Sequence, residues 1–236
     1  MSKPWMTSRS AYVSEMFGAI AERYDVMNFV MTMGQDQRWR RDAVEVADVH
    51  QGDSVLDVAT GTGDLAFELA SKVSPRGHVI GVDFSEPMLE LARRKSAGKH
   101  LPVSFIAGDA LRLEFSDDSF AGVTCAFGLR NLDDRLRGIE EMARVVAPGK
   151  RVVVLELTPP SNTLARQYMD HVIPRLGQLL ARARDAYTYL PESVSEFPDA
   201  QALGSMMQSA GLRSVTYRYL NFGTVALHWG TKPSDG

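Results

Sequence analysis

The chain has 236 residues, of which 44% are hydrophobic and 23% are charged, so it can bury the core of an ordinary globular protein. The formal net charge is -3 and the basic residues are scattered along the chain, which argues against a nucleic-acid partner. The single cysteine, Cys125, excludes an intramolecular disulfide and a cysteine-rich zinc site, and we expect no bound metal.

The apolar segments of the chain bear on its location. The first residues, MSKPWMTSRSAY, lack the apolar core of a signal peptide, and no run of about 18 uncharged apolar residues follows. We therefore expect a cytoplasmic protein, whose contact with the inner face of a membrane is at most peripheral.

The first 50 residues are expected to form a helical cap. Residues 10–49 have helical character, and a basic segment follows Gly34. The apolar side chains at helical spacing are those of Met16, Phe17, Ile20, Ala21 and Tyr24.

Residues 51–157 alternate between strand and helix signals. Strands are expected at 54–59, 78–83, 103–107, 120–127 and 152–157. Helices are expected from about 63 to 73, after Ser85 as N-cap, and from Asp133-Asp134 until Pro148-Gly149 stops the helix. This alternation predicts an α/β doubly wound domain, with a mostly parallel sheet covered on both faces.

The end of the chain, residues 201–236, differs in character. A helix that stops at Gly211 precedes two strand-like runs, 214–220 and 224–229, and the short link between them requires an antiparallel pair. Residues 158–200 are expected to form a mostly helical insertion that acts as a substrate lid. All four segments are expected to form a single domain.

The segment GTGDLA, residues 61–66, follows the first strand of this core and matches the dinucleotide-binding fingerprint G-x-G-x-x-G/A. Gly61 and Gly63 permit a sharp turn and a close approach of the backbone to a ligand, although a tight turn without a ligand fits as well. Asp83, 22 residues after Gly61, can accept hydrogen bonds from the hydroxyls of a ribose. Asp109-Ala110 follows the third strand, where an adenine would lie, and an Asx turn is the alternative for Asp109.

The charges beside this loop help to choose among ligands. Asp57 within the first strand and Asp64 after the second glycine oppose a pyrophosphate and favour a cationic ligand. S-adenosylmethionine combines an adenosine with a sulfonium and an ammonium group. The pattern therefore favours S-adenosylmethionine over NAD, and the terminal antiparallel pair agrees with the class I methyltransferase version of a Rossmann-like sheet, which has seven strands.

Six motifs are distributed along nearly the whole chain: MFGAIAERYDVMN (16–28), GQDQRWRR (34–41), VLDVATGTGDLA, FGLRN (127–131), YTYLPESVSEFPD (187–199) and VALHWG (225–230). Together they resemble the motifs of the S-adenosylmethionine-dependent C-methyltransferases of ubiquinone and menaquinone biosynthesis. The resemblance implies methyl transfer to a ring carbon of a polyprenylated hydroquinone, with demethylmenaquinol as the first expected acceptor. A 2-polyprenyl-6-methoxy-benzoquinol and a soluble phenolic compound are the alternatives, and an NAD-dependent oxidoreductase and a non-catalytic binding module are the rivals from other classes.

The resemblance also assigns roles to residues. It implies cofactor contacts for Thr62, Asp83, Asp109 and Ala110, whereas Ala126 replaces the family's usual serine and keeps only a backbone contact. Arg130 is expected to face the cofactor crevice and stabilise phenolate charge, with a salt bridge to Asp133 or Asp134 as the structural alternative.

Other residues are expected on the substrate side. Tyr24, Asn28 and Asn131 are assigned there, with ordinary helix packing as the alternative for the first two. His228 could accept a proton, but a packed and hydrogen-bonded histidine is the preferred interpretation.

A helical stripe within the insertion, with arginines beside it, is expected to serve as a lid that faces the membrane and the prenyl tail. It consists of Leu176, Leu179, Leu180 and Ala183, flanked by Arg175, Arg182 and Arg184. Packing on the sheet and a homodimer contact are the alternatives for this stripe.

Overall fold

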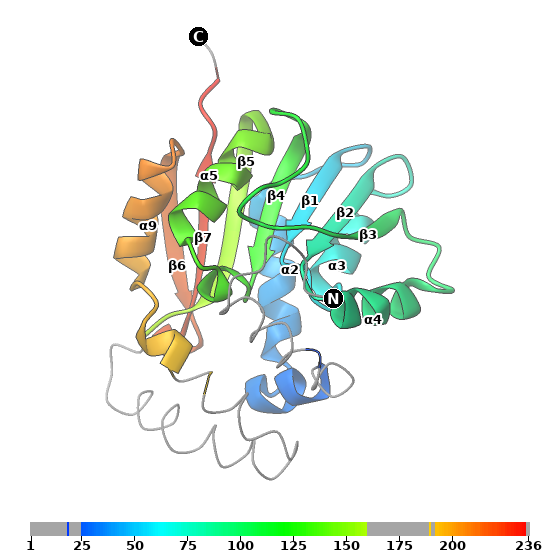
Figure 1. Ribbon diagram of the computed structural model, residues 1–236, viewed down its shortest axis with the longest axis horizontal. Helices are drawn as coiled ribbons and strands as arrows, with labels where there is room; N and C mark the ends of the chain where they lie inside the picture. The colour runs from blue at the N-terminus through cyan, green and yellow to red at the C-terminus, as the bar shows by residue number, and fades with distance from the viewer. Residues whose placement is uncertain (1–17, 19–24, 160–188, 190–191, 235–236) are drawn as a thin grey trace.

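The protein is described by a computed structural model that covers residues 18, 25–159, 189 and 192–234. Its centre is a seven-stranded sheet with the order β3-β2-β1-β4-β5-β7-β6 (Figure 1). The strands are β1 (Ser54–Val58), β2 (His78–Asp83), β3 (Val103–Ala107), β4 (Phe120–Ala126), β5 (Val146–Leu157), β6 (Arg213–Leu220) and β7 (Val225–Thr231).

The first five strands are parallel, and β7 lies antiparallel between β5 and β6. This arrangement confirms the predicted class I methyltransferase sheet with its antiparallel C-terminal pair. β1 pairs with β2 on one side and with β4 on the other. The order of the strands therefore reverses between β1 and β4. Ligands of such sheets bind at the carboxyl ends of the strands beside this point.

Helices cover both faces of the sheet (Figure 1). They are α2 (Gln35–Ala47), α3 (Asp64–Val73), α4 (Glu86–Ser96), α5 (Arg135–Val145) and α9 (Ala200–Ser209), with two short 3-10 helices, η1 (Leu129–Asn131) and η3 (Asn221–Gly223). One apolar core lies between the sheet and α2, α3 and α4, and a second lies between the sheet and α5 and α9. Side chains of β1 alternate between them: Val55 joins the first core, while Leu56 and Val58 join the second.

The helix starts follow local chemistry. Asp134 and Asp199 cap α5 and α9, because their carboxylates accept the N–H groups of Arg137 and Ala202 at 3.0 and 2.8 Å. Ser85 precedes α4 as predicted, but its side chain makes no capping hydrogen bond. Its hydroxyl is buried without a partner among the described residues.

The predicted end of the helix before Pro148-Gly149 is wrong. Helix α5 already ends at Val145, and β5 begins at Val146, which pairs with Phe120 of β4. A helix reaching Pro148 would bring the proline ring against the carbonyl of Arg144. That carbonyl instead accepts hydrogen bonds from the N–H of Asp118 and from Nζ of Lys232.

The N-terminal cap and the insertion are described only in part. Residues 25–32 are helical and lead through a turn into α2, and residues 192–195 are helical as well. The apolar stripe at 176–183 and its arginines lie outside the described residues. Within the part of the chain that is described, no helix combines the length and the apolar character needed to cross a bilayer.

Candidate active site

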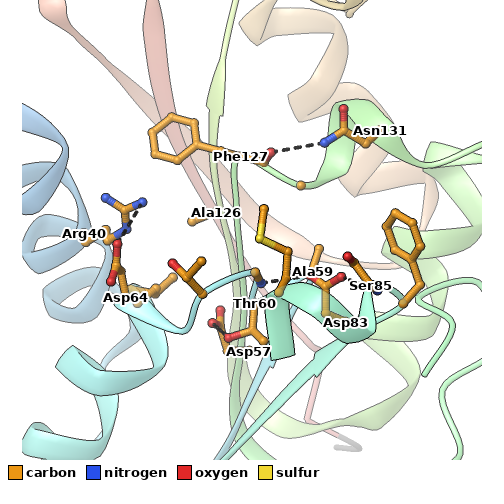
Figure 2. Close-up of a pocket in the computed structure, with 16 residues that line it drawn as sticks. Arg40, Asp57, Ala59, Thr60, Asp64, Asp83, Ser85, Ala126, Phe127 and Asn131 are labelled. Carbon is orange, nitrogen blue, oxygen red and sulfur yellow. Dashed lines mark hydrogen bonds and ion pairs between the residues drawn. The ribbon is translucent and has the colours of Figure 1, made fainter. Parts of the chain in front are cut away.

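A cavity with about 640 Å³ of free space, part of it open to solvent, lies at the carboxyl ends of β1, β2 and β4 (Figure 2). Residues from the loop after β1, the end of β2 and the loop after β4 line it, and α2 contributes Arg40. A second, adjoining cavity with about 520 Å³ of free space, part of it open to solvent, lies towards β3 and shares Ala59, Asp83, Phe84 and Asn131 with the first. The sequence motifs predicted to bind a ligand thus meet at the edge of the sheet where the fold predicts one.

The two glycines of the loop after β1 have different tasks. Gly61 has a φ of 56° and lines the cavity, and a Cβ placed there would meet no atom within 4 Å. Gly63 has a φ of 87°, does not line the cavity, and a Cβ there would lie 2.7 Å from the ring of Phe105. Gly61 therefore keeps the backbone open to a ligand, whereas Gly63 permits the turn and the packing of α3 against β3.

Asp83 fixes this loop to the end of β2. One carboxylate oxygen accepts the N–H of Gly61 at 2.8 Å, and the other accepts the N–H of Ser85 at 2.8 Å. The side chain is almost fully buried and lines both cavities. Its carboxylate is thus held at the cavity wall in a fixed orientation.

Asp57 is a buried carboxylate in the floor of the cavity. Burial raises its pKa to about 6, although hydrogen bonds from Thr60 and Thr124, at 2.6 and 2.7 Å, and the charge of Arg40 act in the opposite direction. A cation bound in the cavity would favour the charged form of this carboxylate.

Asp64 adds less negative charge to the cavity than the sequence suggests. Its carboxylate is paired with Nζ of Lys95 and lies 3.9 Å from Nη2 of Arg40. Lys95 also binds Asp25, whose other oxygen accepts the hydroxyl of Thr62 at 2.6 Å. The preference for a cation therefore depends on Asp57, while Asp64 and Thr62 belong to a network that connects the N-terminal helix to the loop.

Asp109 and Ala110 line the second cavity, and their contact with an adenine stays a prediction. The carboxylate of Asp109 also accepts the N–H of Leu111 at 2.9 Å, which is the Asx turn named as its alternative. The two interpretations are compatible, because the turn fixes the backbone that borders the cavity.

The end of β4 contributes Ala126 to the cavity wall, and the loop after it contributes Phe127 and Asn131. The prediction that Arg130 faces the crevice is wrong, because its side chain is 5% exposed and Nη1 lies 2.8 Å from Oε1 of Glu156 on β5. Its guanidinium also donates to the carbonyl of Phe127. A ligand in the cavity would therefore contact the neighbours of Arg130, and Arg130 itself holds the loop.

The remaining predicted residues are placed as follows. Tyr24 lies outside the described residues. Asn28 lies in the helical segment 25–32, where its carbonyl accepts the hydroxyl of Thr32 at 2.7 Å, and it does not line either cavity. His228 is buried, with Nε2 2.8 Å from the carbonyl of Ala200, as the packing interpretation expected.

Sequence reasoning missed Arg40 as a residue of the site. It belongs to the quoted segment GQDQRWRR, but three arginines stand there together and no local pattern singles out the one that turns inward. In the structure Arg40 is buried, whereas Arg38 and Arg41 are exposed.

A doubly wound sheet with an antiparallel terminal pair, a glycine loop after β1, and acidic residues near the ends of β1 and β2 are the features of the class I methyltransferase fold. A SAM-dependent methyltransferase from Thermotoga maritima has the same fold, with a TM-score of 0.65 and 20% identity over 92% of this chain and 98% of that chain. The chain belongs to the ubiE/COQ5 methyltransferase family, whose sequence profile matches residues 5–232. S-adenosylmethionine is the methyl donor of this family, which decides against NAD and against a binding module without catalysis.

Two relatives are similar over most of their length. The demethylmenaquinone methyltransferase of Deinococcus radiodurans is 48% identical, covering 93% of this chain and 92% of the relative. The ubiquinone/menaquinone biosynthesis C-methyltransferase UbiE of Desulfotalea psychrophila is 43% identical, covering 97% of this chain and 93% of the relative.

Proposed function

We propose that the protein transfers the methyl group of S-adenosylmethionine to a ring carbon of demethylmenaquinol and forms menaquinol. Family membership and the names of relatives such as that of Deinococcus radiodurans support this acceptor. The observation that carries the proposal is the cavity at the ends of β1, β2 and β4, where the open Gly61, the fixed carboxylate of Asp83 and the buried carboxylate of Asp57 converge.

These residues fit the cofactor by their chemistry. We assign Asp83 to the ribose hydroxyls, the Asp109-Ala110 backbone to the adenine, and Asp57 to the cationic end of the cofactor. Gly61, Thr62 and Ala126 border the space for the methionine moiety, and Gly63 supports this loop from behind. When bound, the cofactor supplies an electrophilic methyl group, and no residue of the chain has to become covalently modified.

The acceptor carbon must be close to the methyl group and rich in electrons. The new carbon–carbon bond forms as the carbon–sulfur bond breaks, and the ring then loses a proton to restore its aromatic character. The protein contributes by holding the quinol in line and by excluding water, which together account for several kcal/mol in such sites. Asn131, in the same loop as Arg130, lines the cavity, so we assign it to this side. The assignment of Tyr24 and Asn28 to this side stays a prediction from the sequence, and Asn28 lines neither cavity.

The experiment is a transfer assay with isotopically labelled S-adenosylmethionine and a panel of acceptors. The panel contains short-chain demethylmenaquinol, a 2-prenyl-6-methoxy-benzoquinol, soluble phenols, and the oxidised form of each quinone as control. We expect label in the naphthoquinol and none in the oxidised forms. Label only in the benzoquinol, or only in a soluble phenol, would mean that this compound and not demethylmenaquinol is the acceptor. No label in any quinol would overturn the proposal.

We also propose that the protein contacts lipid peripherally, because the prenylated acceptor is a membrane compound. An exposed apolar stripe on the helical segment 25–32 and the turn after it supports this contact, with the i, i+3, i+4, i+7 spacing of an amphipathic surface. It consists of Val26, Phe29, Val30 and Met33, which are 63%, 53%, 38% and 75% exposed.

Sedimentation with liposomes tests this contact. We expect the protein to sediment with liposomes and the variant V26S/F29S to stay in the supernatant, with the exposed control substitution Glu45→Gln behaving as wild type. Equal sedimentation of all three would contradict the role of the stripe. A homodimer remains a separate prediction, which light scattering of the purified protein would test.

A further inference from the structure

Arg40 is a buried cation in the wall of the cofactor cavity. It projects from α2, its side chain is 9% exposed, and it lines the same cavity as Asp57 and Gly61 (Figure 2). A guanidinium in such a place needs anionic partners, because burying an unpaired charge is costly.

The contacts of Arg40 inside the protein use only part of its hydrogen-bonding capacity. Nη1 donates to Asp36, and the 3.9 Å between Nη2 and the carboxylate of Asp64 is too long for a hydrogen bond. The guanidinium carbon lies 5.6 Å from the centre of the Phe127 ring, which also lines the cavity. Among the described residues, Nε and Nη2 therefore keep donors without a hydrogen-bond acceptor.

The orientation of Arg40 is fixed from behind. The hydroxyl of Thr32 donates to one oxygen of Asp36 at 2.8 Å, and Arg40 is held by the other oxygen. Because Asp36 is itself buried and anchored, it holds one edge of the guanidinium and leaves the other edge for a ligand.

The charges follow a definite order along the cavity. Figure 2 shows Arg40 with Asp64 at one end, Asp83 with Ser85 at the other end, and Asp57 between them. The charge of Arg40 reaches Asp57, because it counteracts the rise of the pKa of that carboxylate. A ligand held at Asp83 by its ribose would therefore present its far end to a carboxylate and a guanidinium together.

We infer that Arg40 binds the carboxylate of the methionine moiety of S-adenosylmethionine, while Asp57 faces the ammonium group. The amino-acid end of the cofactor is a zwitterion, and the paired charges of Asp57 and Arg40 match its two groups. The planar guanidinium can form two parallel hydrogen bonds to a carboxylate, which an ammonium of lysine cannot. The inference depends on the cofactor of the family and is independent of the acceptor that is methylated.

The rival explanation is purely structural: Arg40 would only connect α2 to α3 through Asp64. The two explanations differ in their ligand dependence. A carboxylate contact affects ligands that carry the carboxylate, whereas a structural role affects every nucleoside ligand alike.

Calorimetric titration with two ligands separates the explanations. S-adenosylmethionine carries the carboxylate, and decarboxylated S-adenosylmethionine lacks it but keeps the adenosine, the sulfonium and an ammonium group. For wild type we expect the decarboxylated ligand to bind more weakly than S-adenosylmethionine by roughly 10- to 100-fold. This is the affinity that one hydrogen-bonded pair of charges typically contributes. Similar affinity of wild type for both ligands would overturn the inference, and this measurement requires no variant to fold.

Variants add a second test. Arg40→Gln should lose affinity for S-adenosylmethionine by about the same factor and change less than about threefold for the decarboxylated ligand. Arg41→Gln removes the same charge from an exposed neighbour on α2 and should bind both ligands as wild type does. An equal loss of both ligands by Arg40→Gln would support the structural explanation, and failure of wild type to bind either would contradict the cofactor itself.

Discussion

Nη1 of Arg130 lies 2.8 Å from Oε1 of Glu156, and both side chains are buried beneath the loop that follows β4. Glu156 also accepts the backbone N–H groups of Arg130 and Leu157, at 3.1 and 2.9 Å. The pair therefore joins the loop of Phe127 and Asn131 to β5. Because this loop forms one wall of the cavity and neither Arg130 nor Glu156 lines it, the pair supports the wall from behind.

Loss of Arg130 should damage folding and cofactor binding together. Arg130→Ala leaves Glu156 buried without its counter-charge, a change that typically costs about 3–5 kcal/mol. We expect a lower free energy of unfolding in urea and weaker binding of S-adenosylmethionine. A variant with wild-type stability and cofactor binding but little turnover would restore the catalytic role that the sequence suggested.

A double variant serves as control for this prediction. In R130M/E156L both charges are replaced by apolar side chains, so no buried charge remains unpaired. We expect most of the stability to return, because such replacements of buried pairs are often neutral or stabilising. A double variant as unstable as Arg130→Ala would show that the lost packing and hydrogen bonds, and not the uncompensated charge, are the cause.

The buried carboxylate of Asp57 should make the ligand-free protein less stable above pH 6. Its pKa is about 6 in the folded state and 3.8 as a reference, so the folded state binds more protons between these values. This contribution to stability is present below pH 3.8 and is lost as pH rises through 6, by about 3 kcal/mol for a shift of this size.

Asp57→Asn tests the loss of stability caused by the buried charge and the role of that charge in cofactor binding. We expect the variant to be more stable than wild type at pH 7.5, with a smaller difference at pH 4.5, in urea unfolding without ligand. The same variant should bind S-adenosylmethionine more weakly, because it offers no charge to the ammonium group. A difference in stability that is equal at both pH values would contradict the assigned titration.

The sequence predicted what local patterns determine. The strands of the core, the glycine loop and the carboxylate of Asp83 follow from apolar runs and from residue spacing, and the antiparallel end follows from a short turn. The partners of Arg130 and Asp64 did not follow, because Glu156 and Lys95 lie 26 and 31 residues away and only packing brings them close. Arg40 was missed for the same reason, since the inward side of α2 depends on which face meets the sheet.

Gly128 should not tolerate a side chain. A Cβ at this position would overlap with Cβ of Ala59, which lines the cavity opposite the loop after β4. Gly128→Ala must therefore displace the loop or the end of β1, and overpacking of this kind typically costs about 1–3 kcal/mol. We expect a lower melting temperature and weaker cofactor binding by calorimetry.

Gly204→Ala is the matched control for this substitution. Gly204 lies inside α9, and a Cβ there would meet Tyr217 and Val215 at 3.9 Å, an ordinary contact. We expect this variant to be more stable by about 0.5–1 kcal/mol, because alanine favours the helix. If both alanines had the same effect on stability and binding, the overlap with Ala59 would not be the cause.

His228 should make the protein less stable as the solution becomes acidic. Burial lowers its pKa in the folded state, where Nε2 lies 2.8 Å from the carbonyl of Ala200 and the ring stacks on Tyr217 at 5.0 Å. The unfolded imidazole takes up a proton near pH 6.5 while the folded one stays neutral. The contribution of His228 to the free energy of unfolding is therefore fully present above this pH and is lost as pH falls below it. Its sign is opposite to that of the contribution of Asp57.

His228→Gln keeps a donor for Ala200 and removes the titration. We expect the variant to be less stable than wild type at pH 8, because it loses the stacked ring, and the difference to shrink at pH 5.5. Urea unfolding at both pH values measures the difference in the free energy of unfolding. The titration of Asp57 does not affect this difference, because both proteins contain Asp57. His78→Gln, at an exposed position, is the control for a histidine-to-glutamine change outside the core. A difference for His228→Gln that does not change between pH 8 and pH 5.5 would mean that the buried imidazole does not titrate in this range.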